Sequence, residues 1–327
     1  MAIYYLSFIT LVLLVEAIPG AVAKKHDLDI NRDLDIFGTP DFVEGVTYTV
    51  TSTLDQVSTM EILQSKYDVV VKLEGTQELT ASARAEGGKE IDTVLTHFMM
   101  HMDMMGFVTD FDSDHMDDAP PEFSSFSDLI GVKTTVVIDD HGNLVEVKGP
   151  LKIQDKNVAD ESAEFSHEVQ DAKEENAQTT MPFDSSSQYQ YMTRLDKALP
   201  EGPVKPGDSW DVTSDLNGLG SITGMATLSG YRLYQNHDVA VIQLDGKLEI
   251  NSNAILGALD PSDADPSITF HDAEIKALMF WDNSAKLMRW SQSNQTMVME
   301  MPNPMDEKAT FKVPVSQNIT VMIDEAE

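Results

Sequence analysis

The stretch of sequence that decides the fold is GVTYTVT, residues 45–51. In an extended chain Val46, Tyr48 and Val50 lie on one face and the threonines between them on the other. Similar alternating or apolar runs recur along the chain, separated by clusters of Gly, Pro, Asn and Asp. We expect these strands at 67–73, 91–108, 133–138, 144–147, 209–212, 222–234, 239–244, 268–281, 287–301 and 309–323, with 91–108 forming either one longer strand or a bent pair. The sequence therefore predicts a mainly β protein.

The predicted strands fall into two similar halves, residues 45–150 and 201–327. Residues 45–50 resemble 207–212, each with an aromatic residue three positions after a glycine. Residues 66–75 resemble 236–246 with one insertion, and a hairpin at 138–147 resembles one at 281–290. This order predicts a duplicated unit that forms two similar antiparallel meander sheets, arranged as a curved half-barrel or a sandwich. Turn chemistry common to β proteins is the alternative explanation.

Residues 151–200 between the halves have a different composition, rich in acidic residues, alanine and lysine. Phe165, Val169 and Ala172 have helical spacing, which predicts an exposed, acidic helical linker. A second helix is expected to begin near Asp184 and to end at Pro200.

The first 23 residues have the pattern of a signal peptide. An apolar run from Ile3 to Val15 is too short to span a bilayer, and the small residues Ala21-Val22-Ala23 follow it. We expect cleavage after Ala23, an acidic N-terminal segment at 24–44, no membrane span in the mature chain, and a secreted protein. In a bacterium the location would be the periplasm or the cell surface.

Composition excludes several classes of function. Hydrophobic residues make up 42% of the chain, which is enough for a folded core. The chain has no cysteine, so disulfides and thiol redox chemistry are excluded. A formal charge of -33 repels phosphate backbones, so no nucleic acid partner is expected. In a eukaryotic secretory route, Asn294 and Asn318 would be candidates for glycosylation.

The densest group of candidate metal ligands is HFMMHMDMM, residues 97–105. In a strand His97, Met99, His101 and Asp103 share one face, and imidazole and thioether ligands suit copper. Residues on one face are about 7 Å apart along a strand, so one ion would need a bulge or a partner strand. In the alternative, the methionines of the opposite face fill the core and the histidines lie at the surface.

A second group of candidate ligands begins like a calcium loop, with Asp110, Asp112 and Asp114 at alternate positions. It fails as an EF-hand, because His115 occupies the glycine position and Pro121 the position of the closing glutamate. Weak calcium binding by carboxylates is one hypothesis for this loop and for the acidic residues at 27–36 and 260–265. Solvated turns are the other.

Several motifs occur together in a known family. They are Phe111-Asp112-Ser113, the hairpin from Asp139 to Gly149, Leu199-Pro200 and the run Pro203-Val204-Lys205-Pro206-Gly207-Asp208-Ser209-Trp210. In these the chain resembles exported proteins of the domain of unknown function 6263 family, over most of residues 45–323. It differs in its acidic segment 153–176, its methionine-rich strand and its lack of a lipid-anchor cysteine. The resemblance implies an exported β protein, and it supplies no catalytic residues.

Three hypotheses of function follow. The first is a secreted, non-catalytic binding, envelope or matrix protein that holds an apolar ligand in a concave sheet, the partner being a small molecule, lipid, glycan or protein. The second is an acidic extracellular protein that binds calcium or copper. The third is a hydrolase, which requires a cleft where two carboxylates, or a histidine and a nucleophile, converge. No enzyme signature in the sequence favours the third.

Overall fold

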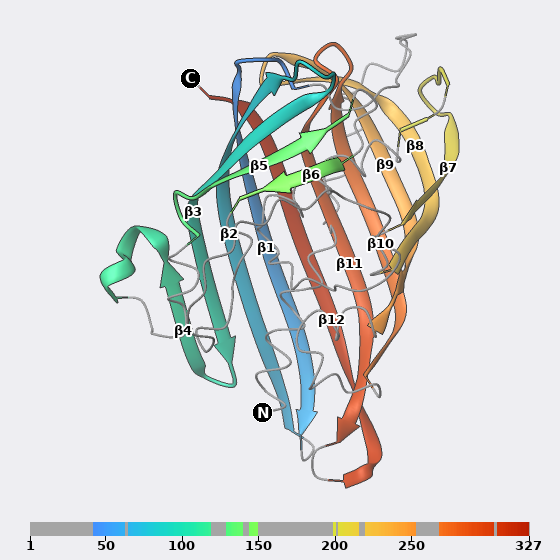
Figure 1. Cartoon of the computed structure of the whole chain (residues 1–327). Helices are drawn as coiled ribbons and strands as arrows, with labels where there is room; N and C mark the ends of the chain where they lie inside the picture. The colour runs from blue at the N-terminus through green and yellow to red at the C-terminus, as the bar shows by residue number, and fades with distance from the viewer. Residues whose placement is uncertain are drawn as a thin grey trace.

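The computed structural model describes residues 42–62, 65–118, 129–139, 144–149, 199–200, 202–215, 220–252, 268–303 and 306–326 (Figure 1). Its strands are β1 (Thr47–Ile62), β2 (Ser65–Ala83), β3 (Lys89–Met104), β4 (Phe107–Asp112), β5 (Lys133–Ile138), β6 (Leu144–Lys148), β7 (Ser209–Asp215), β8 (Gly220–Tyr234), β9 (His237–Ile250), β10 (Thr269–Asp282), β11 (Leu287–Asn303) and β12 (Asp306–Glu325). A short 3-10 helix, η2 (Ser113–Asp118), follows β4. The expectation of a mainly β protein is confirmed.

The strands form one antiparallel meander sheet instead of the two sheets that we expected. Their order is β6-β5-β3-β2-β1-β12-β11-β10-β9-β8-β7, and β4 pairs with β3 beside this path. The two halves join where β1 pairs with β12, from Tyr48 opposite Glu325 to Ser58 opposite Val315. This pairing satisfies the backbone N–H and C=O groups of two strands that would otherwise be open edges.

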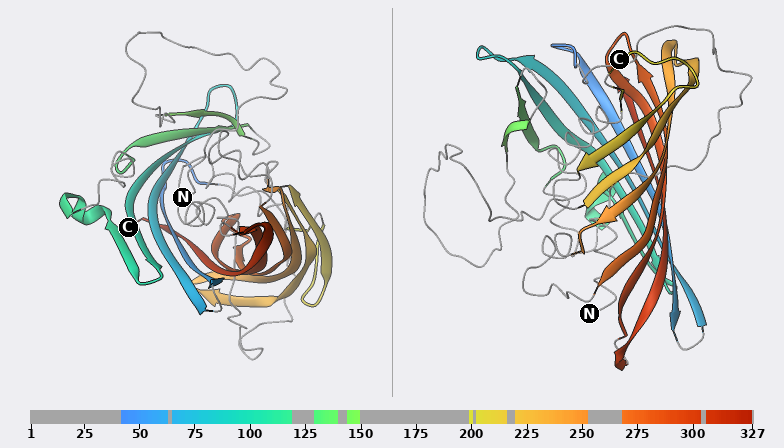
Figure 2. Two further views of the ribbon diagram at one scale, coloured as in Figure 1. Left: turned by 90° about the horizontal axis from the view of Figure 1, so that it is seen from below. Right: turned by 90° about the vertical axis from the view of Figure 1, so that its right-hand side faces the viewer.

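The sheet is curved and open, with β6 and β7 at its two edges (Figure 2). It is therefore closer to the expected half-barrel than to a sandwich. Gly224 of β8 lies directly opposite Gly246 of β9. A Cβ at Gly224 would lie 2.5 Å from the carbonyl oxygen of Asp245 and 2.7 Å from the Cα of Gly246. The strands approach too closely here for a side chain on this face.

One face of the sheet, which we call the core face, carries the main hydrophobic core. Val50, Leu54, Phe98, Ile242 and Ile319 lie on it, each at most 2% exposed except Ile319 at 4%. Along β1 every second residue from Tyr48 to Met60 is buried, while the residues between them are partly or fully exposed. This agrees with the alternation in GVTYTVT. We call the opposite face the outer face.

At one end of the sheet, Arg289 of β11 joins three other strands. Its Nε lies 3.2 Å from Asp282 Oδ2 of β10, and its Nη2 lies 3.0 Å from Glu325 Oε1 of β12. The same Nη2 lies 3.3 Å from His237 Nδ1 of β9. Arg289 and Asp282 are 2% and 1% exposed, so their charges are buried as a pair.

The two halves run across the sheet in the same direction, as a tandem repeat requires. The first half ends at the edge strand β6, whereas the second begins at the edge strand β7 and ends with β12 beside β1. Two of the three sequence similarities relate equivalent strands, namely β1 to β7 and the β5–β6 hairpin to the β10–β11 hairpin. The third relates β2 to β9, which are the second and third strands of their halves.

Other predictions fall outside the described residues. They are the signal peptide with its cleavage after Ala23, most of the acidic N-terminal segment, the helical linker of 151–198 and the acidic loop at 260–265. Each remains a prediction. Within the described ranges, no helix has the length and hydropathy needed to cross a membrane.

Candidate metal centre and core face

Strands β3 and β4 bring the two predicted groups of metal ligands to one surface. They pair so that Met99 lies opposite Asp112 and His101 lies opposite Asp110. The side chains of both groups lie on the outer face, whereas Phe111 of β4 is buried on the core face. Two groups of candidate ligands that are separate in the sequence therefore form one surface.

A β-bulge determines which face His97 occupies. The pairing of β2 with β3 shifts at Thr96, so that Leu95 and Phe98 are both buried on the core face. His97 consequently lies on the outer face. The backbone N–H of Phe98 donates to Ser113 Oγ at 2.9 Å, which fixes the start of η2 against β3.

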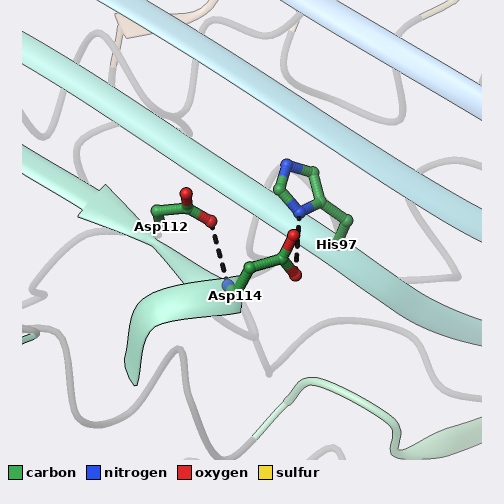
Figure 3. A group of neighbouring side chains, drawn as sticks. All are labelled: His97, Asp112 and Asp114. Atoms are coloured by element: carbon green, nitrogen blue, oxygen red, sulfur yellow. Dashed lines mark hydrogen bonds and ion pairs between the residues drawn. The ribbon is translucent and has the colours of Figure 1, made fainter. Parts of the chain in front are cut away.

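His97, Asp112 and Asp114 form the centre of this surface (Figure 3). One ligand atom from each lies within 4.8 Å of the others. His97 Nδ1 is 3.4 Å from Asp114 Oδ1, and the backbone N–H of Asp114 donates to Asp112 Oδ1 at 2.9 Å. His97 and Asp112 are half-buried, while Asp114 is exposed.

Local hydrogen bonds favour the ionised form of Asp112. The backbone N–H of Asp114 and then the ring of His115, whose Nδ1 lies 3.0 Å from Asp112 Oδ2, lower the pKa of the Asp112 carboxyl below its usual value. His115 has φ -127° and ψ 47°, a kink inside η2. The kink brings the ring of His115 back toward Asp112.

The other predicted ligands have different contacts. His101 Nδ1 lies 2.6 Å from Asp110 Oδ1, and four residues of strand place His101 about 13 Å from His97. Asp103 accepts a hydrogen bond of 3.1 Å from the backbone N–H of Gly106, in the turn after β3. Met99 is 38% exposed and lies between the two histidines along β3.

The same cluster contains a serine, a histidine and an aspartate, but not in the geometry of a hydrolase. Ser113 Oγ and Asp114 Oδ1 both lie 3.4 Å from one atom, His97 Nδ1. In a catalytic triad the imidazole uses one nitrogen toward the carboxylate and the other toward the nucleophile. Ser113 is also only 6% exposed.

On the outer face of β7 to β10, a groove of about 820 Å³ carries several carboxylates. Glu274 lies directly opposite Lys247, and Asp245 lies directly opposite Lys276. Opposite charges across neighbouring strands stabilise a sheet, so these carboxylates have a structural explanation.

A polar row crosses the centre of the core face. Gln317 of β12 lies opposite Gln56 of β1 on one side and opposite Gln295 of β11 on the other. Gln317 Nε2 donates to Gln56 Oε1 at 2.7 Å, and Gln56 Nε2 donates to Ser58 Oγ at 3.0 Å. Gln317 Oε1 is buried, and no described residue donates a hydrogen bond to it. Sequence alternation alone did not reveal this row.

The two candidate glycosylation residues lie in strands instead of loops. Asn294 of β11 is directly opposite Asn318 of β12. The Oδ1 of Asn318 is buried and accepts no hydrogen bond from the described residues. Their use as glycosylation sites remains a prediction.

Comparison with solved structures gives low scores. Lipovitellin, from a study of lipid–protein interactions, matches with a TM-score of 0.45 and 9% identity, covering 88% of this chain and 26% of its own. The chain thus spans about a quarter of that lipovitellin chain. DynF from the dynemicin biosynthesis pathway of Micromonospora chersina has a TM-score of 0.19, 7% identity and coverages of 94% and 92%. An outer membrane channel from Pseudomonas putida F1 has a TM-score of 0.21, 8% identity and coverages of 89% and 100%.

Comparison with sequences identifies the family. No curated protein matches the chain. Residues 86–258, more than half of the chain, match the model of a family of unknown function, DUF6263. The match covers β3 to β9, including the candidate metal centre. It confirms the resemblance seen in the sequence motifs: the chain belongs to the family of unknown function DUF6263.

Proposed function

We propose that the protein is an exported, non-catalytic binding protein that holds a lipid-like ligand against the core face of its curved sheet. The observation that carries the proposal is the buried acceptor Gln317 Oε1 within the apolar core face. Export is part of the proposal because of the apolar run and the Ala21-Val22-Ala23 site at the N-terminus.

The surroundings of Gln317 are suited to a ligand that is mostly apolar. Val315 and Ile319 flank it along β12 on the same face and are 5% and 4% exposed. Leu54, opposite Ile319 on β1, is 1% exposed. A hydrocarbon chain that packs among these buried side chains would gain about 0.8 kcal/mol for each CH₂ group that it buries.

The polar row supplies the specificity of the proposed site. A buried acceptor without a hydrogen bond costs about 1–3 kcal/mol. The amide groups donate in one direction, from Gln317 to Gln56 to Ser58, and Gln317 Oε1 receives no hydrogen bond from the described residues. A ligand hydroxyl that donates to this oxygen would remove the cost. We therefore expect a long-chain alcohol or a monoacylglycerol to bind better than an apolar analogue of the same length.

The experiment uses protein recovered from the extracellular fraction, whose N-terminus should be Lys24. Organic extracts of this protein are analysed by mass spectrometry, and the delipidated protein is titrated with a long-chain alcohol and with its methyl ether. We expect the alcohol to bind about fivefold to 150-fold more tightly, the range that corresponds to removing a cost of about 1–3 kcal/mol. Gln317→Leu should abolish this preference.

Ser316→Leu is the matched control, because Ser316 is the exposed neighbour of Gln317 on β12 and its side chain lies on the outer face. It should retain the preference for the alcohol. If the wild type shows no saturable binding of either compound, the proposed function is wrong. If it binds both equally, Gln317 does not contribute and the site must lie elsewhere.

A further inference from the structure

The spacing of the donor atoms at the candidate metal centre matches that of metal ligands. Ligands at about 2.0–2.1 Å from a tetrahedral ion are about 3.3 Å from one another. His97 Nδ1 and Asp114 Oδ1 are 3.4 Å apart. Asp112 supplies a third donor within 4.8 Å, so it needs to move by at most about 1.5 Å, a side-chain adjustment.

The chemistry of the donors selects the class of ion. One imidazole nitrogen and two carboxylate oxygens are neither the six to eight oxygens that Ca²⁺ takes nor the soft set that Cu⁺ prefers. Zn²⁺ and neighbouring divalent metals accept this mixture of nitrogen and oxygen. We propose that His97, Asp112 and Asp114 bind a divalent first-row transition metal ion, with zinc as the physiological ion. Zinc differs from the calcium and the copper that the sequence suggested.

The surroundings hold the ligands in place. Ser113, between two of them in the sequence, is fixed to β3 by the N–H of Phe98. The ring of His115 contacts Asp112 Oδ2, the kind of outer contact that orients a metal ligand. Phe98 and Phe111 pack beneath the surface, with ring centroids 5.9 Å apart. Three protein ligands leave a coordination position for water or for a second molecule, so the ion would be exchangeable.

Metal binding would also have a structural consequence. Among the strands described, β4 pairs with β3 alone. An ion shared by His97 of β3 and Asp114 of η2 would join this hairpin at a second point. Binding to the folded state should therefore raise the unfolding temperature, and the rise should grow with the logarithm of the ratio of ion concentration to dissociation constant.

Calorimetric titration of the full chain with Zn²⁺ tests the site. Because a chain with a charge of -33 attracts cations generally, the titration is performed in excess Mg²⁺. We expect one ion per chain that Mg²⁺ does not displace. Asp114→Asn should weaken binding about tenfold or more. The Asp114 side chain is 66% exposed, so this variant should fold, and its circular dichroism spectrum verifies that.

His271→Ala is the matched control, because His271 Nε2 lies 3.5 Å from Glu300 Oε2 on the outer face and forms no three-donor group with other described residues. It should bind Zn²⁺ like the wild type. The proposal is overturned if Asp114→Asn binds as tightly as the wild type, or if Mg²⁺ displaces the Zn²⁺. It is overturned equally if the two variants lose the same affinity, since the ions would then be held by the acidic surface in general.

Discussion

Replacing Arg289 by Met tests the buried ion pair at the end of the sheet. The change keeps much of the aliphatic volume but removes the Arg289 cation from Asp282, which is 1% exposed, and leaves the ring of His237, with Nδ1 3.2 Å from Asp282 Oδ2, as its basic partner. Losing one partner of a buried pair costs about 3–5 kcal/mol. Asp282 keeps three hydrogen bonds of 2.6–3.0 Å from Ser284 and Ala285, which favours the lower end of that range. Glu325 is half exposed and adds less than about 1 kcal/mol.

We therefore expect Arg289→Met to lose about 3–4 kcal/mol, which corresponds to about 4–6 °C in melting temperature for a chain of this size. Equilibrium unfolding in urea measures the loss. Lys72→Met is the control, because Lys72 and Asp55 are 3.7 Å apart with side chains 59% and 53% exposed, and it should lose less than about 1 kcal/mol. If the two variants lose equal stability, Arg289 and Asp282 are not a buried pair in solution and the reasoning fails.

Two further predictions concern stability. Burial raises the pKa of Asp282, but hydrogen bonds from the turn and from Arg289 outweigh this effect and lower the pKa below the unfolded value of 3.8. The free energy of unfolding should therefore fall as the pH drops below about 4. Asp282→Asn should make this pH dependence weaker, as measured by urea unfolding midpoints across that range. Gly224→Ala should lose about 1–3 kcal/mol in the same assay because its Cβ would meet the carbonyl oxygen of Asp245. The control Gly202→Ala, whose Cβ would have nothing within 4 Å, should be neutral or slightly stabilising. Equal effects of the two changes would contradict the close approach of β8 and β9.

Local alternation was sufficient to predict most of the strands, because each buried face leaves a period of two in the sequence. It could not predict that β1 pairs with β12, since Gln56 and Gln317 are 261 residues apart and nothing local identifies the partner. The same limit applied to the candidate metal centre. The alternation in HFMMHMDMM correctly separated His97 and Met99 from the buried Phe98, but only the β3–β4 pairing shows that His97 lies beside Asp112 and Asp114.

The strand that was predicted too short shows why the candidate ligand site was missed. We expected β1 to end at residue 51, yet it continues to Ile62. The apolar alternation breaks there because Ser52, Gln56 and Ser58 occupy positions of the core face and are at most 8% exposed. Polar residues at core positions violate the pattern that specifies a strand, and such violations concentrate at functional sites. Two of the residues that concealed the second part of β1 from the sequence, Gln56 and Ser58, thus belong to the polar row of Gln317, where we propose that the ligand binds.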